Sequence, residues 1–215
     1  MKYFGYKQKD GLSLTTIKAT MCILISCLLL GCSTYRPSNA NDLCSIFRGE
    51  TDWYEDAVDA NERWGTPIWV MMAIMKQESS FRHDVHAPRD YLLGFIPWGY
   101  KSSAYGFAQA KDEVWGEYRA EVNSGGSRDD FGDAIDFIGW YTHKTQRRLN
   151  ISKWDAYNQY LAYHEGRGGY SRGTYRSKGW LINVAKKVKL QAARYNTQLK
   201  TCKSDLDDAI DSWFF

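Results

Sequence analysis

One carboxylate of this sequence follows a long apolar run, where a charged group is unfavourable. Residues 68–75 are eight consecutive apolar residues, and Glu78 comes three positions later. If the run is a helix, Glu78 lies one turn after Ile74 and two turns after Met71, on an apolar stripe. It also lies in the last turn, where the negative end of the helix dipole opposes a second negative charge. Burial and the dipole both raise the pKa of such a carboxyl group.

A carboxylic acid that keeps its proton near neutral pH can protonate the oxygen of a glycosidic bond. Glu78 is therefore a candidate general acid. The alternative is that the helix emerges into solvent at Lys76 and Gln77 and leaves Glu78 hydrated, because polar helix ends are common. The pattern alone favours neither interpretation.

The helix that must hold this acid is expected over about residues 67–80, capped by Thr66 and with Pro67 in its first turn. Apolar spacing and end signals predict four other helices. They are residues 52–64, a helix from about Asp130, a helix from a capping box at Ser152 to about His164, and a long helix that carries Leu181 through Cys202.

The segment 87–103 has a different character. It contains Pro88, Gly94, Pro97 and Gly99 among aromatic residues, which predicts an irregular loop or a short hairpin. The expected fold class is mainly α, with at most a small β element.

The first 31 residues have the pattern of a secretory signal. Lysines precede an apolar run at residues 21–30, which is too short to cross a membrane as a lone helix. The run leads into Leu29-Leu30-Gly31-Cys32, which resembles the bacterial lipobox. That resemblance implies an acylated Cys32, and Ser33 after it implies sorting to the outer membrane, facing the periplasm of a Gram-negative bacterium. The alternatives are an uncleaved anchor and plain secretion.

Two cysteines are left for a disulfide. Of the five in the sequence, Cys22 and Cys27 leave with the signal and Cys32 is committed to lipid. Because exported proteins fold where disulfides persist, we expect Cys44 and Cys202 to pair.

Residues 78–81, 104–109 and 161–166 are three short segments that, in this order, resemble the motifs of the soluble-lytic-transglycosylase (SLT) domain, which has a lysozyme-like fold and cuts peptidoglycan glycan strands. Residues 78–81 (Glu-Ser-Ser-Phe) look like its glutamate-serine motif. Residues 104–109 (Ala-Tyr-Gly-Phe-Ala-Gln) are similar to its glycine-leucine-methionine-glutamine motif, and residues 161–166 (Leu-Ala-Tyr-His-Glu-Gly) resemble its alanine-tyrosine-asparagine-x-glycine motif. Each match is weak alone, but three in order after a lipobox are strong together.

The resemblance implies a role for each matched residue. Glu78 is the general acid and afterwards the base, and Tyr163 places its hydroxyl near Glu78 to orient the carboxyl group. Ser79 hydrogen-bonds near the N-acetyl or peptide-bearing group of the substrate. Gln109 lines the groove near the scissile sugar, with Gly106 letting the backbone turn close by. Without the family, Tyr163 would be read as a core tyrosine, and Ser79 and Gln109 as surface or cap residues.

Three further residues are expected to contact substrate. Tyr105 lies inside the second motif, and Trp98 in the 87–103 segment offers an aromatic face that suits stacking on a sugar ring. The alternative for that segment is a loop that packs on itself. Glu165 departs from the third motif and puts a second carboxylate beside Tyr163.

The number of catalytic acids decides the reaction. Hydrolysing glycosidases generally use two carboxyl groups. The SLT resemblance implies one, because the 6-hydroxyl of the muramic acid attacks its own anomeric carbon and leaves a 1,6-anhydroMurNAc end, with no cofactor and no metal. One alternative is a hydrolytic muramidase that uses Glu165 or Asp84 as the second carboxylate. The other is a non-catalytic lipoprotein that binds peptidoglycan with the same groove.

The expected domains are a signal peptide (1–31), a tether after acylated Cys32 (32–41), the SLT catalytic domain (42–204) and a tail (205–215). Without the signal, 24 of the 28 basic residues and 24 of the 25 acidic residues remain, so the net charge is zero. This balance argues against a general nucleic-acid partner, because such binding depends on excess positive charge. The expected partners are peptidoglycan strands and, through the lipid, a membrane. The tail is either a handle for an unknown envelope protein or an end that folds back on the domain.

Overall fold

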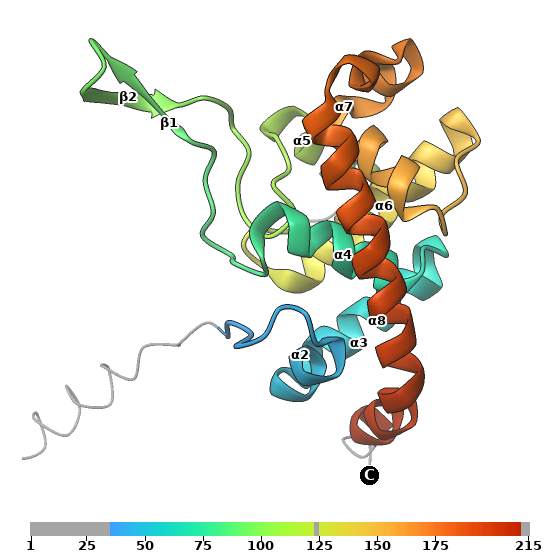
Figure 1. Cartoon of the computed structure of the whole chain (residues 1–215). Helices are drawn as coiled ribbons and strands as arrows, with labels where there is room; N and C mark the ends of the chain where they lie inside the picture. Colours follow the sequence, from blue (N-terminus) through green and yellow to red (C-terminus); the bar gives the residue numbers. More distant parts are fainter. Residues whose placement is uncertain (1–34, 123–124, 212–215) are drawn as a thin grey trace, which may run out of the picture. The chain divides into compact units, whose positions relative to one another are not determined.

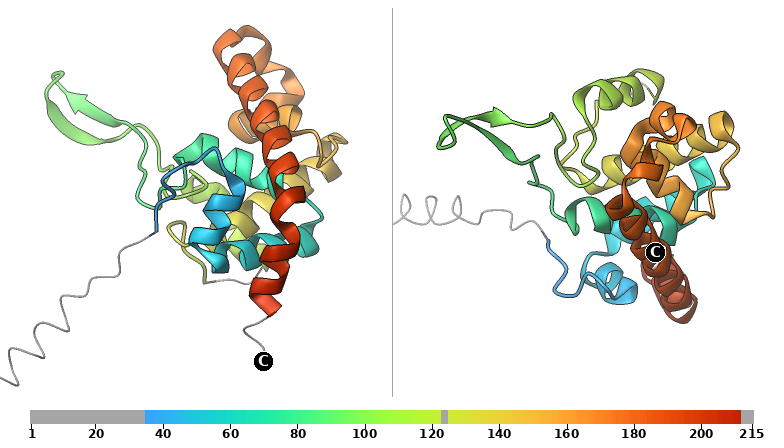
Figure 2. Two further views of the ribbon diagram at one scale, coloured as in Figure 1. Left: turned by 60° about the horizontal axis from the view of Figure 1, so that its bottom comes forward. Right: turned by 45° about the horizontal axis from the view of Figure 1, so that its top comes forward.

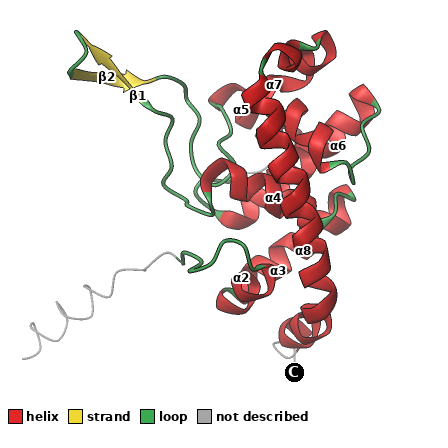
Figure 3. Ribbon diagram, in the orientation of Figure 1, coloured by secondary structure: helices red, strands yellow, loops and turns green. Residues whose placement is uncertain are grey.

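The structure, a computed structural model, describes residues 35–122 and 125–211. The fold belongs to the compact unit Arg36–Phe215. Helices make up most of it, so the mainly α class is confirmed (Figures 1 and 3). The predicted signal peptide and Cys32 lie outside the described residues. The elements are α2 (Leu43–Gly49), α3 (Thr51–Trp64), α4 (Ile68–Ser79), β1 (Arg89–Leu92), β2 (Ile96–Tyr100), α5 (Asp112–Val122), α6 (Phe131–Leu149), α7 (Ala156–Arg172), the 3₁₀ helix η1 (Thr174–Ser177) and α8 (Gly179–Asp211).

Helix α4 lies in the core because its sequence is apolar on every side. All residues from Val70 to Met75 are buried, and the helix contacts α3, α6, α7 and α8. The predicted buried helix is therefore confirmed. Thr66 is not its cap: its hydroxyl is hydrogen-bonded to that of Thr142 at 2.7 Å, and Pro67 occupies the N-cap position. The side chain of Thr66 is buried, where a neighbouring hydroxyl satisfies it better than the helix end.

The other predicted helix ends are partly confirmed. Helix α3 ends before Gly65, and the Asp130 carboxylate caps α6 by accepting from the Asp133 N–H at 2.9 Å. The capping box at Ser152 is wrong: the cap of α7 is Asp155, which accepts from the Asn158 N–H at 3.1 Å. Serine and aspartate both favour the N-cap position, and here the helix begins after Asp155 and not after Ser152.

The predicted end of this helix near His164 is confirmed, because Gly166 has non-helical backbone angles, with φ 72° and ψ 153°. A second helical stretch follows up to Arg172, and α7 denotes both stretches. That backbone region is essentially restricted to glycine. The glycine therefore ends the first stretch of α7 and starts the second in a new direction.

Helix α8 runs the length of the unit (Figure 1). The predicted pair Cys44 and Cys202 is bonded, joining α2 to α8 with their Cα atoms 6.0 Å apart. The tail boundary at residue 205 falls inside α8, where Leu206 is buried. Because all these helices, the core and the disulfide lie within residues 36–215, this unit is expected to fold on its own.

Strands β1 and β2 form an antiparallel hairpin where a loop or short hairpin was predicted. The register shifts between Asp90 and Tyr91, where β2 has one extra residue, Trp98. In the views of Figures 1 and 2 the hairpin stands away from the helices, and both strands are exposed throughout. Within residues 35–122 and 125–211, no helix combines the length and the apolar character needed to cross a membrane.

Candidate active site

The three motif segments meet at one cleft, with a cavity volume of about 480 Å³. It lies between the end of α4, the two stems of the hairpin, the start of α5, and helices α6 and α7. Its lining residues are Glu78, Ala87, Pro88, Ser102, Ala104, Gln109, Ala110, Lys111, Glu113, Val114, Phe137, Tyr141, Tyr163, His164, Glu165 and Gly166.

Glu78 enters this cleft from the last turn of α4. The helix stops one residue later, because Ser80 adopts a left-handed conformation with φ 53°. The side chain is half-buried, and burial raises its pKa from 4.5 to about 7, although a hydrogen bond from Tyr160 opposes part of the rise. At neutral pH a substantial fraction of this carboxyl group therefore carries a proton.

Two tyrosines of α7 lie close to the acid, Tyr163 as predicted and Tyr160 in addition. The Tyr163 hydroxyl donates to the carbonyl of Ala108 at 2.6 Å, so this side chain ties α7 to the second motif segment. The phenol that hydrogen-bonds the Glu78 carboxyl is Tyr160, which is buried. Burial raises the pKa of Tyr163, and the nearby Glu78 raises it further. Tyr160 lies one turn before Tyr163, and this spacing was the one signal in the sequence that could have identified it.

Gln109 and Gly106 shape the wall of the cleft. The Gln109 amide nitrogen donates to the carbonyls of Val85 at 2.8 Å and of Gly106 at 2.9 Å, so this side chain braces the loop. Gly106 has φ 76°, and a Cβ there would lie 1.9 Å from the Arg128 carbonyl oxygen. Glycine is therefore required for the close approach of the two segments.

Glu165 lines the cleft, but its carboxylate is engaged in structural contacts. Its side chain is 4% exposed and accepts from Lys178 at 2.7 Å, from His164 at 3.2 Å and from Thr174. Burial alone would raise its pKa, but the three donors, Lys178 foremost, lower it to about 2. The side chain is therefore ionised at neutral pH, and it links α7 to Thr174 and Lys178.

Three other predicted contacts lie outside the cleft lining. Ser79 is buried, and its hydroxyl donates to the carbonyl of Met75 at 3.3 Å. Tyr105 turns to the Asp129 carboxylate at 3.1 Å, and Trp98 is exposed on β2, away from the cleft. Ser79 follows Glu78 directly, so the helix turns it into the core when Glu78 faces the cleft.

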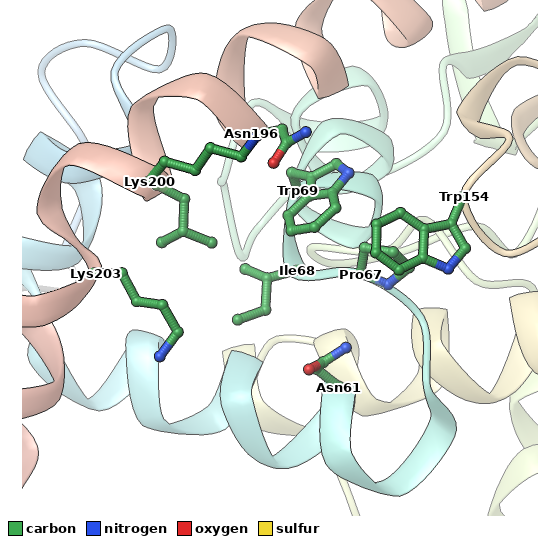
Figure 4. A pocket seen from close by; sticks show the side chains of 9 residues that line it. Asn61, Pro67, Ile68, Trp69, Trp154, Asn196, Lys200 and Lys203 are labelled. Atoms are coloured by element: carbon green, nitrogen blue, oxygen red, sulfur yellow. The ribbon is translucent and has the colours of Figure 1, made fainter.

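Two other cavities can be compared with this one. The cavity in Figure 4, about 280 Å³, is lined by Trp69, Trp154 and neighbouring amides and lysines, and no carboxylate lines it. A second cavity contains Asp56, whose pKa burial and neighbouring carboxylates raise to about 7. None of the three motif segments lines that cavity, and its Asp136 already accepts from Tyr118 at 2.7 Å.

Comparison with known proteins agrees with the motifs. The family model of the transglycosylase SLT domain matches residues 20–202 of the chain. A search of curated proteins found no match. The family match confirms the resemblance drawn from the three motifs and, with it, the lysozyme-like character of the helical fold.

Proposed function

Because the chain belongs to the transglycosylase SLT family, we propose that it cleaves the β-1,4 bond between MurNAc and GlcNAc in peptidoglycan and leaves 1,6-anhydroMurNAc ends. Family membership indicates peptidoglycan cleavage of the transglycosylase type. The single observation that carries the finer proposal is Glu78, a cleft carboxyl group whose pKa burial raises to about 7.

In the proposed reaction, the Glu78 carboxyl group acts twice. It first donates its proton to the glycosidic oxygen, and the bond from that oxygen to the anomeric carbon of MurNAc breaks. The resulting Glu78 carboxylate then takes the proton of the MurNAc 6-hydroxyl as its oxygen bonds to the anomeric carbon. The acid recovers its proton, and water is not consumed. A pKa near neutrality suits a group that must both give and take a proton.

The other carboxylates support a mechanism with one acid. Glu165 is held by Lys178 and has a pKa of about 2, which makes it a weak base for activating water. Asp84 does not line the cleft and is paired with Arg36 at 2.9 Å. Glu113 does line the cleft, on the first turn of α5, and is exposed. It is the carboxylate that a hydrolytic alternative would use.

The neighbours of Glu78 are proposed as positioning residues. Tyr160 fixes the carboxyl group by its hydrogen bond, and Tyr163 holds the wall of the cleft through Ala108. The Gln109 amide oxygen remains as an acceptor toward substrate, because both bonds that this side chain makes to the loop come from its nitrogen.

The experiment is digestion of purified sacculi with residues 36–215, followed by mass spectrometry of the released muropeptides. We expect anhydro ends from the wild type and a loss of about 10²–10⁴-fold in rate for Glu78→Gln, the range for removal of a general acid. Glu113→Gln is the matched control, because it neutralises an exposed carboxylate of the same cleft. It should leave the anhydro product unchanged.

Other outcomes would contradict the proposal. Reducing ends that disappear in Glu113→Gln or Glu165→Gln would identify a hydrolytic muramidase. No fragments from the wild type, together with co-sedimentation of the protein with sacculi, would identify a non-catalytic peptidoglycan-binding protein.

The proposed location is the periplasmic face of the outer membrane, with the chain anchored by lipid on Cys32. The lipobox-like residues 29–32 support the anchor, and the disulfide between Cys44 and Cys202 suits an oxidising compartment. Labelling of the expressed full chain with a radioactive fatty acid tests this. Label should be lost in Cys32→Ser, and label that persists would contradict acylation at this residue.

A further inference from the structure

The hairpin carries most of the exposed large apolar side chains of the described residues. Seven lie on it and three elsewhere. Leu93 and Phe95 at the turn are 76% and 71% exposed, and the turn is closed by the Phe95 N–H, which donates to the Leu92 carbonyl at 3.4 Å. A contiguous exposed apolar patch of this kind is uncommon in soluble proteins and usually marks an interaction site.

The apolar surface covers both faces of the hairpin. Leu92 pairs with Ile96 and Tyr91 with Pro97, and successive residues of a strand point to opposite faces. A protein partner or a glycan strand lying on one face would leave the other apolar face in water. A surrounding apolar medium covers both.

The residue types are also ordered along the hairpin. Between Tyr91 and Trp98 every residue is apolar or glycine, so the tip (residues 92–96) has no side chain that could hydrogen-bond a sugar. Tyr91 and Trp98 come next, between the tip and the base of the hairpin. The base has two basic residues, Arg89 and Lys101, and one acidic residue, Asp90. A bilayer has the same order: hydrocarbon, then an interface that favours Trp and Tyr, then anionic headgroups that attract basic residues.

We propose that the hairpin is a membrane-binding element whose tip, residues 92–96, enters the interfacial region of an anionic phospholipid bilayer. The insertion is shallow, because the two strands have unpaired outer edges whose backbone groups require water or headgroups as partners. The basic residues at the base then face the headgroups. This proposal does not depend on the activity of the cleft.

Membrane binding at the tip would position the cleft. Ala87, Pro88 and Ser102, in the stems of the hairpin, line the cleft. From Pro88 to Leu93 an extended chain spans about 17 Å at ~3.3 Å per residue. The hairpin would therefore hold the cleft about 17 Å above the bilayer, with the hairpin side of the molecule facing the lipid.

The test is co-sedimentation of residues 36–215 with vesicles of phosphatidylethanolamine and phosphatidylglycerol. We expect the double variant Leu93→Ser/Phe95→Ser to bind at least about tenfold more weakly, because it removes apolar area from the tip. Lys101→Glu should weaken binding to these vesicles more than binding to phosphatidylcholine vesicles. The matched control is Leu190→Ser on α8, which removes a side chain that is 69% exposed and should change binding less than about twofold.

Three results would overturn the proposal. The first is that the wild type does not sediment with vesicles, or that the double variant sediments equally well. The second is that the wild type is a dimer which the double variant converts to a monomer, so that the tip binds a second copy. The third is that the double variant digests lipid-free sacculi more slowly while binding vesicles normally, so that the tip contacts glycan. Unchanged thermal unfolding would show that each variant is folded.

Discussion

At the scale of single residues, the state of the Glu78 carboxyl group depends on two opposing effects. Burial raises its pKa, and the hydrogen bond from Tyr160 lowers it, with a net value of about 7. The acid therefore changes charge near neutral pH. Both its activity and its effect on stability should follow this titration.

The first prediction concerns stability. Because the folded pKa of Glu78 is about 7 against an ordinary 4.5, the unfolded chain loses this proton first as pH rises. The contribution of this group to stability therefore falls between these two values and stays lower above them. Glu78→Gln is neutral throughout, so it should be more stable than the wild type above pH 7, by up to about 3 kcal/mol. Urea unfolding at acidic and alkaline pH measures the difference, and an equal gain at both would contradict the raised pKa.

The second prediction separates Tyr160 from Tyr163. Tyr160→Phe removes the hydrogen bond that lowers the pKa of Glu78, so the alkaline decline of kcat/KM should move to higher pH while kcat falls. Tyr163→Phe instead leaves the Ala108 carbonyl without its donor and should cost about 1–3 kcal/mol of stability without moving that decline. Profiles of kcat/KM against pH for both variants distinguish these two roles. A shift in Tyr163→Phe alone would return the orienting role to Tyr163.

The sequence identified Glu78 but not its hydrogen-bond donor, for a physical reason. An apolar run followed by one acid is a local pattern, and the family motif marks the same residue. The donor depends on how α7 is rotated about its axis against α4, which is a matter of tertiary packing. The prediction for Ser79 was limited in the same way, because a motif does not say which of two neighbouring side chains faces the cleft.

At the scale of elements, the position of the second motif segment depends on the close contact between Gly106 and the Arg128 carbonyl. Gly106→Ala would bring a Cβ to 1.9 Å from the Arg128 carbonyl oxygen, so the backbone must move. We expect a loss of more than about 2 kcal/mol in stability and a large loss of activity, because Gln109 and Ala108 move with it. Gly94→Ala is the control, since Gly94 also has a positive φ of 81° but open space around it. Thermal unfolding and sacculus digestion compare the two, and equal effects would show that backbone strain alone matters.

Two helices were predicted closely from the sequence, whereas α2 and α5 were not predicted. Helix α3 and α4 were predicted within about two residues, because apolar spacing and Gly65 are strong local signals. The interruption of α7 at Gly166 was predicted, because glycine, which readily adopts a positive φ, is a strong end signal. The second stretch of α7, up to Arg172, was not predicted. Packing of α7 on α8 and η1 and the Glu165–Lys178 ion pair at 2.7 Å are tertiary contacts that the local sequence does not show.

At the scale of the whole molecule, the disulfide joins segments near the two ends of the described fold. Cys44 and Cys202 are 158 residues apart in sequence, and neither lines the cleft. The double variant Cys44→Ser/Cys202→Ser should lose up to about 5 kcal/mol of stability in the chain-entropy model. Its rate of sacculus digestion at low temperature should stay close to that of the wild type. Urea unfolding and digestion assays measure both, and a lost rate with unchanged stability would contradict this assignment.

The same covalent link has a consequence for damage to the chain. Residues 88–101, which include the hairpin, are exposed throughout and lie between the two cysteines, so we expect a protease to cut there. Such a cut separates Glu78 from Gln109 along the backbone, yet both fragments remain one molecule through sulfur. A nicked enzyme would keep its two halves assembled until a reductant releases them.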